Sequence, residues 1–217
     1  SCPCGSGKKY KHCCSYEKIK QEVDQLIESS QVSLDVDLKA VLAIDDPSLD
    51  DAKKHLIQTP SSLYTSKDFH VLGVQLNMSG FQELSIKFLN KSLDKDSKNY
   101  GAWLDLAAIL NHSGQSEKSL ECIDKVPEGF KRKTIIKANT LKNLVGLEKV
   151  THLYEKAVRE EPDFHLPYIN LALANKLGSE TSNYWVNLGF KNIPGDAELG
   201  FQWARQKFFR KEYEELV

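Results

Sequence analysis

The sequence predicts an all-α protein in which a helical-repeat solenoid follows a small cysteine-rich N-terminal module. Two observations carry this prediction: an apolar pattern that occurs twice at helical spacing, and four cysteines close together at the start of the chain. The 217 residues are 41% hydrophobic and 27% charged, a composition typical of a globular chain that can bury a core. The length suits one ordinary domain with a small attachment.

Four of the five cysteines, Cys2, Cys4, Cys13 and Cys14, lie close together, and Cys122 stands alone. A C-x-C pair, followed after eight residues by two consecutive cysteines, can bring four thiolates to one point. The glycines between the two pairs allow the tight turn that this requires. Zinc favours such a tetrahedral set, and a filled Cys4 shell has no position open for water or substrate. We therefore expect one structural Zn²⁺ per chain. Disulfides are the weaker alternative, because pairs so close in sequence would close strained rings.

The loop between the two cysteine pairs has two further features. His12 could replace Cys14 as the fourth ligand, because zinc accepts nitrogen as well as sulfur. Residues 1–20 contain five lysines and one glutamate. This basic segment suits a weak electrostatic contact with an acidic partner rather than nucleic-acid recognition by itself.

The segment Cys2–Cys14, which reads CPCGSGKKYKHCC, closely resembles the SEC-C motif, the zinc-binding tail of the bacterial preprotein translocase ATPase. In that family the last ligand, directly after the third, is His or Cys, so the resemblance implies that Cys2, Cys4, Cys13 and Cys14 are the ligands here. It also implies a partner contact, because such modules contact an export chaperone and have been tied to ribosome binding. The chain has no G-x-x-x-x-G-K-[ST] phosphate loop, so nothing in it resembles the translocase motor.

An apolar pattern with helical spacing recurs further along the chain. Its two matching sets are Phe69, Leu72, Gly73 and Leu76, then Trp103, Leu106, Ala107 and Leu110. Their separation equals the period of tetratricopeptide (TPR) repeats, about 34 residues, and the pattern resembles theirs. In such repeats each helix pair covers the apolar face of its neighbour. A second-helix pattern follows at Tyr154 and a further first helix at Tyr168, whereas residues 134–141 match poorly and indicate a diverged third unit.

These patterns predict four parts of the chain. We expect the SEC-C zinc module at residues 1–16, N-terminal helices at 17–63, TPR-like repeats at 64–194 and a C-terminal capping helix at 195–217.

The first helices of TPR-like repeats are expected to line a groove. Nine residues fall on its side: His70, Val74, Asn77, Ala108, Asn111, Asn139, Lys142, Leu173 and Lys176. Some TPR proteins hold the terminal carboxylate of a chaperone in a clamp of Lys, Arg and Asn. That clamp is not reproduced here, because Val74, Asp105 and Ile136 occupy three of its positions.

Four other side chains invite a functional interpretation. Trp103 occupies the large packing position of a repeat and is expected in the core. Trp185 and Trp203 either close the end of the array or form an exposed aromatic patch for a partner. Cys122 is expected to be a buried structural residue.

Several classes of function are not supported by the sequence. The balance of 29 basic and 30 acidic residues argues against specific DNA binding. The longest apolar stretches, such as residues 166–174, are shorter than the roughly 20 residues that span a bilayer, so no membrane insertion is expected. The histidines form no H-E-x-x-H motif, and no enzyme activity is expected. The chain opens without a secretory signal, so a cytoplasmic location is expected.

The sequence therefore predicts a cytoplasmic adaptor whose repeat groove binds a protein or peptide. The zinc module would make a second contact, with an export chaperone or the ribosome if the resemblance extends that far. Two alternatives stay open. The zinc could be purely structural beside a TPR scaffold, or the loop Lys8-Lys9-Tyr10-Lys11 could contact RNA or the ribosome.

Overall fold

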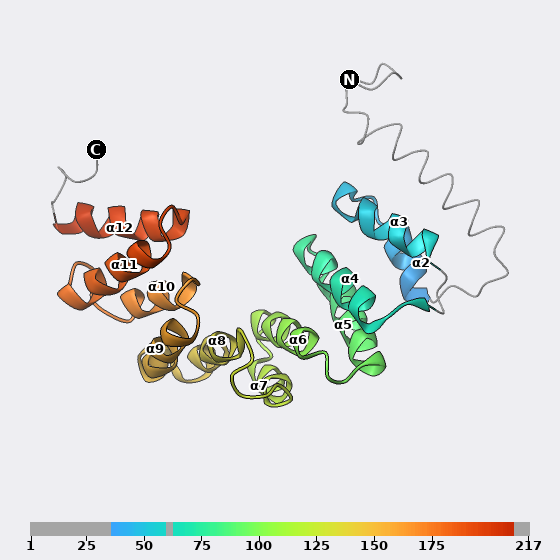
Figure 1. The fold of residues 1–217 in the computed structure, drawn as a ribbon, viewed down its shortest axis with the longest axis horizontal. Coiled ribbons are helices and arrows are strands. Elements are labelled where there is room, and N and C mark those ends of the chain that lie inside the picture. The colour runs from blue at the N-terminus through green and yellow to red at the C-terminus, as the bar shows by residue number, and fades with distance from the viewer. Residues whose placement is uncertain (1–35, 60–62, 211–217) are drawn as a thin grey trace, which may run out of the picture. The chain divides into compact units, whose positions relative to one another are not determined.

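The computed structural model describes residues 36–59 and 63–210, which form helices joined by turns and contain no strand (Figure 1). The all-α class and the helical repeats predicted from the sequence are confirmed. The predicted zinc module lies outside the described residues, as does the start of the predicted N-terminal helices. The chain divides into two compact units: unit 1 ends at Asp105 and unit 2 begins at Leu106, so the boundary falls within α6 (Tyr100–His112).

The described part of unit 1 is a succession of short helices. They are α2 (Val36–Leu42), the 3₁₀ helix η2 (Pro47–Leu49), α3 (Asp50–Gln58), α4 (Ser66–Met78), α5 (Gln82–Lys95) and the beginning of α6. A capping box fixes the start of α4: Thr65 Oγ1 accepts the backbone N–H of Asp68, and the Asp68 carboxylate accepts the N–H of Thr65. The local sequence thus determines where the first repeat begins.

Helices α4 and α5 pack extensively against each other in unit 1. A Cβ atom at Gly73 would lie 2.9 Å from Leu89 Cγ, so only glycine permits this approach. Next to it, the Ser85 hydroxyl donates to the Gly73 carbonyl at 2.7 Å. The predicted positions Phe69, Leu72, Gly73 and Leu76 are all buried, and the apolar members belong to one core cluster.

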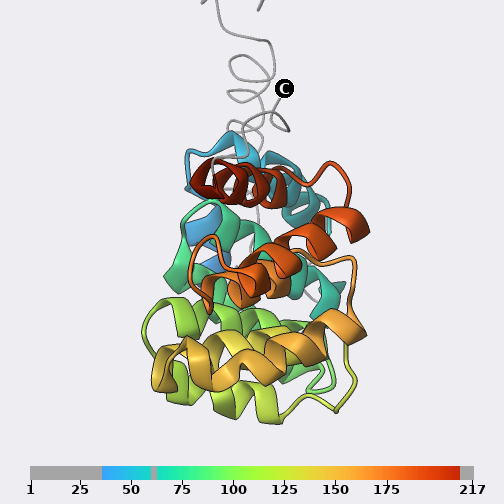
Figure 2. The same cartoon turned by 90° about the vertical axis from the view of Figure 1, so that its left-hand side faces the viewer.

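The helices of unit 2 follow one another in successive layers, and each contacts the next from α7 to α12 (Figure 2). They are α7 (Ser116–Asp124), α8 (Lys133–Val145), the 3₁₀ helix η4 (Leu147–Val150), α9 (Thr151–Glu160), α10 (Leu166–Leu173), α11 (Glu180–Asn192) and α12 (Ala197–Arg210). The segment that matches the repeat pattern poorly is nevertheless a regular helix, α8. In the pair formed by α8 and α9, the 3₁₀ turn η4 opens the second helix.

The core of unit 2 is built around two tyrosines that are fully buried, Tyr154 on α9 and Tyr168 on α10. Both were expected from the repeat pattern to pack between helices. The hydroxyl of Tyr168 donates to the Pro162 carbonyl at 2.9 Å, so the polar end of this ring is satisfied inside the core.

The three tryptophans differ in their surroundings. Trp103 is only half-buried, and its indole N–H donates to the Ser97 carbonyl at 3.0 Å, so the expected core position is met only in part. The indole must keep its polar edge near an acceptor, which holds the ring at the edge of the core. Trp185 packs against the cluster of Tyr168, Ile169 and Leu199, as expected for a residue that closes the end of the array. Trp203 stacks on Phe190 with ring centroids 5.9 Å apart.

Helix α12 occupies the described part of the segment predicted as a capping helix. Its residue Leu199 is fully buried, whereas Phe201 and Phe208 on the same helix are exposed. The boundaries of the four predicted parts stay a prediction. Among the described residues, no helix combines the length and the apolar character that crossing a membrane requires.

Two helical glycines of unit 2 give a matched test of this packing. A Cβ at Gly189 would lie 2.9 Å from both Leu199 Cδ2 and Tyr168 Cγ, whereas one at Gly200 would come no closer than 3.7 Å to Phe190. We expect Gly189→Ala to lower the free energy of unfolding by about 1 to 2 kcal/mol through overpacking. Gly200→Ala should raise it by up to about 1 kcal/mol through better helix propensity. Urea unfolding followed by circular dichroism measures the free energy of unfolding of both variants. A change of the same sign in both would contradict the packing described here.

Candidate functional site

The four N-terminal cysteines predicted to bind zinc lie outside the described residues, and so does His12. The zinc site therefore stays a prediction. Within residues 36–59 and 63–210, no group of three or more His, Cys, Asp or Glu side chains is arranged to hold a metal ion.

Cys122 on α7 is buried, as predicted. Burial raises the pKa of its thiol to about 11, because the thiolate would lose its hydration. At neutral pH this cysteine is therefore a protonated thiol, which is a poor nucleophile.

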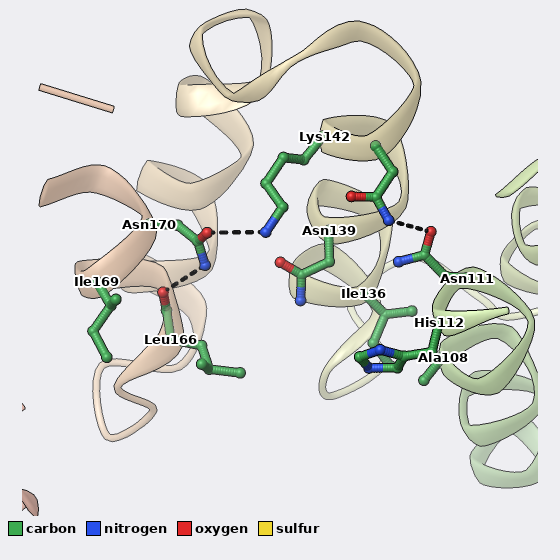
Figure 3. Close-up of a pocket in the computed structure, with 10 residues that line it drawn as sticks. Ala108, Asn111, His112, Ile136, Asn139, Lys142, Leu166, Ile169 and Asn170 are labelled. Atoms are coloured by element: carbon green, nitrogen blue, oxygen red, sulfur yellow. Dashed lines mark hydrogen bonds between the residues drawn. The ribbon is translucent and has the colours of Figure 1, made fainter. Parts of the chain in front are cut away.

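A cavity of about 430 Å³ lies between α6, α8 and α10, the first helices of three successive pairs (Figure 3). All the residues that line it belong to unit 2. Its walls combine apolar and amide side chains with one lysine and one histidine: Ala108, Asn111, His112, Ile136, Asn139, Lys142, Asn143, Leu166, Ile169 and Asn170. We call these ten residues the groove.

Asn111 is fixed in the wall of the groove by two donors. Its Oδ1 accepts a hydrogen bond from Asn143 Nδ2 at 3.0 Å and another from the Ser116 hydroxyl at 2.9 Å. Asn111 is only 9% exposed, so its orientation is set by these contacts. With the oxygen held in this way, the Nδ2 group lies on the side of the cavity (Figure 3).

Asn139 is oriented from behind by Tyr154. The Tyr154 hydroxyl donates to Asn139 Oδ1 at 2.8 Å, and the tyrosine ring itself is fully buried in α9. Burial raises the pKa of Tyr154 far above its ordinary value, so the phenol keeps its proton and remains the donor. The Nδ2 group of Asn139 is thus left to face the groove.

Asn170 connects the opposite wall to the lysine. Its Nδ2 donates to the Leu166 carbonyl at 2.9 Å, which leaves Oδ1 to accept from Lys142 Nζ at 3.2 Å (Figure 3). Asn170 is 8% exposed. Lys142 is half-buried, and the one hydrogen bond that the described residues give it is this bond to a neutral amide.

The predicted groove positions are brought together in part. Ala108, Asn111, Asn139 and Lys142 all line the cavity, as the sequence predicted. The others do not line it: His70, Val74 and Asn77 on α4 of unit 1, and Leu173 and Lys176 in unit 2. His70 instead contacts Asp105 in unit 1, with 2.7 Å between Nε2 and Oδ2. Asp105 and Ile136, assigned to clamp positions, differ in that Ile136 lines the cavity and Asp105 does not.

Sequence reasoning missed five lining residues: His112, Asn143, Leu166, Ile169 and Asn170. A usable signal was present, because Asn143 follows Asn111, and Asn170 follows Asn139, at nearly the same spacing. That spacing is slightly shorter than the usual TPR period of about 34 residues, so applying the usual period to the whole chain hides the correspondence. A separate, shorter period for the later repeats would have revealed both pairs.

Two family models match parts of the chain: the SEC-C motif at residues 1–15 and a tetratricopeptide repeat at residues 88–121. They confirm both resemblances seen in the sequence. No curated protein is significantly similar to the chain.

Among solved structures, the chain is similar to the C-terminal part of a TPR repeat-containing protein from Cytophaga hutchinsonii. The TM-score is 0.56 at 14% identity, covering 93% of this chain and 84% of that chain. It is also similar to the MamA RS-1 ArsTM double mutant, with a TM-score of 0.51 at 16% identity, covering 84% of this chain and 94% of that chain. Likeness at such identities concerns the fold. The chain is thus a helical-repeat protein that carries a SEC-C motif and a tetratricopeptide repeat.

Proposed function

We propose that this protein is a non-catalytic interaction adaptor whose groove binds an extended segment of a protein partner. The observation that carries the proposal is the groove itself, in which amide side chains from α6 and α8 are held with their N–H groups toward the cavity. An asparagine amide matches the hydrogen-bonding groups of a peptide backbone. The apolar residues Ala108, Ile136, Leu166 and Ile169 provide a surface for the side chains of the bound segment.

The SEC-C module supplies a second contact in this proposal. One structural Zn²⁺ would be held by Cys2, Cys4, Cys13 and Cys14, a set of four thiolates that suits tetrahedral zinc. The basic loop between the cysteine pairs, Lys8 to Lys11, would then attach weakly to an acidic surface such as that of a chaperone or the ribosome. The proposed location is cytoplasmic, where free thiols persist to bind metal.

Two other proposals keep part of this picture. In one, the zinc only orders the N-terminus and the groove binds its partner alone. In the other, the lysine-rich loop contacts RNA or the ribosome. The adaptor and the structural-zinc proposal both place partner binding in the repeat groove, whereas the RNA or ribosome proposal depends only on the lysine-rich loop.

Filling the groove should weaken peptide binding. Ala108→Trp places a large ring in the cavity, whereas Leu144→Trp on α8 adds the same ring at an exposed position that does not line it. Random peptides displayed on phage would first be selected on the full chain, and a selected peptide then titrated by fluorescence anisotropy. We expect Ala108→Trp to weaken binding by at least about tenfold, which is about 1.4 kcal/mol, and Leu144→Trp to leave it unchanged. A selection that yields no binder, or equal affinity for all three proteins, would overturn the groove as a peptide site.

The zinc site can be tested by metal analysis of the purified chain. We expect about one zinc per chain after dialysis under reducing conditions, since four thiolates bind structural zinc tightly. Cys13→Ser should abolish zinc retention, because a hydroxyl is a poor zinc ligand, while Cys122→Ser is the matched control and should retain it. Serine at Cys14 should weaken retention unless His12 replaces it. Zinc loss in the Cys122 variant, or none in the Cys13 variant, would contradict the ligand set.

Chelation distinguishes the order of the zinc module from that of the repeats. About fourteen residues with few apolar groups cannot form a core of their own and must draw their order from the metal. A strong chelator should therefore remove amide protection in residues 1–16 during hydrogen exchange and leave residues 100–175 protected, with little loss of helicity. Global helix loss on chelation would show that zinc supports the repeat core and would contradict two separable surfaces.

A further inference from the structure

We infer that the segment bound in the groove is acidic, with a side-chain carboxylate accepting hydrogen bonds from Lys142 and from the amide groups of Asn111 and Asn139. This inference rests on the proposed peptide-binding function and adds the chemical class of the partner. It concerns the balance of donors, acceptors and charge inside the groove.

Internal contacts occupy most of the acceptor sites of the inner amides. Oδ1 of Asn111 already accepts two hydrogen bonds, and Oδ1 of Asn139 and of Asn170 accepts one each. The Nδ2 groups of Asn111 and Asn139 have no acceptor among the residues that the structure describes. The side-chain acceptor sites that remain are one further lone pair on Oδ1 of Asn139 and of Asn170, and the acceptors of the exposed residues Asn143 and His112. Donors on Asn111, Asn139 and Lys142 therefore outnumber the acceptors of the inner surface, which suits a ligand that brings acceptor oxygens.

The charge of the groove points the same way. Among its ten lining residues, all of them described, none is acidic, and Lys142 is the one with a permanent charge. The Lys142 ammonium has three donors, of which one is bound to the neutral Oδ1 of Asn170. A half-buried ammonium with an amide as its neighbour has lost part of its hydration without gaining a counterion. A carboxylate on the ligand would supply that counterion.

The number of cations selects a peptide over a nucleic acid. A nucleic-acid backbone carries a phosphate at every nucleotide and is bound through several lysines or arginines. The groove contains one lysine, several amide side chains and four apolar residues, which are Ala108, Ile136, Leu166 and Ile169. This arrangement fits one carboxylate within a segment that also carries apolar side chains.

The test compares matched acidic and neutral peptides. Random peptides displayed on phage are selected on the full chain, and the sequences are examined for enrichment of Asp or Glu at one position. A selected peptide and its Glu→Gln or Asp→Asn analogue are then titrated against the natural chain, Lys142→Met and Lys118→Met. Lys118 is the matched control, since it lies on α7, which contributes no residue to the groove.

We expect the acidic peptide to bind about tenfold more tightly than its neutral analogue, a typical difference for a hydrogen bond to a charged group. Lys142→Met should remove that difference, whereas Lys118→Met should preserve it. Raising the ionic strength should weaken binding of the acidic peptide more than that of the analogue. Tyr154→Phe removes the donor that orients Asn139, so it should weaken binding of the acidic peptide severalfold. Circular dichroism should show that the fold of this variant is preserved.

The outcomes separate this inference from the function on which it rests. The acidic partner would be overturned, and the peptide groove kept, by selected peptides that lose binding to Ala108→Trp but show no enrichment of Asp or Glu. Equal binding of the acidic peptide to Lys142→Met and to the natural chain would have the same meaning. An absence of selected peptides would overturn the peptide groove as well. Displacement of the acidic peptide by a single-stranded RNA oligonucleotide, lost in Lys142→Met, would assign the groove to nucleic acid and overturn the inference.

Discussion

The close crossing of neighbouring helices is the constraint on which the rest of this structure depends. At Gly73 the backbone of α4 meets Leu89 of α5, and at Gly189 the backbone of α11 meets Tyr168 and Leu199, with no room for a Cβ atom. Isolated helices of this length are marginal in water, so each must bury a face against the next. A glycine at the crossing point brings two helices close enough for the large side chains on either side to fill the space between them.

The groove is a consequence of this pairing, because it places side chains from α6, α8 and α10 around one cavity. The second helices of the pairs do not line that cavity, yet they determine its chemistry. Ser116 of α7 holds Asn111, and Tyr154 of α9 holds Asn139, each through the amide oxygen. In both residues the amide nitrogen then faces the cavity. The core thus decides which hydrogen-bonding groups the groove presents.

The two proposed binding surfaces draw their order from different sources. The repeats are held by buried apolar faces and by internal hydrogen bonds, including those of the fully buried Tyr154 and Tyr168. The SEC-C segment contains too few apolar residues for a core, so its order is proposed to come from metal ligation. Cysteines serve both parts in opposite ways. Cys122 packs as a small protonated side chain, whereas the N-terminal set is proposed to act as thiolates.

The sequence by itself determined the fold class and part of the groove. The recurring apolar pattern predicted paired helices at Phe69 and Trp103, because burial of one face imposes helical spacing on the apolar residues. The repeat pattern also identified Ala108, Asn111, Asn139 and Lys142 as groove residues. Asn143 and Asn170 join them in the structure, and a shorter period applied to the later repeats of the sequence would have indicated both residues. Only the tertiary structure decided which end of each amide faces the cavity, because that orientation depends on donors such as Tyr154, which lies on a different helix from Asn139.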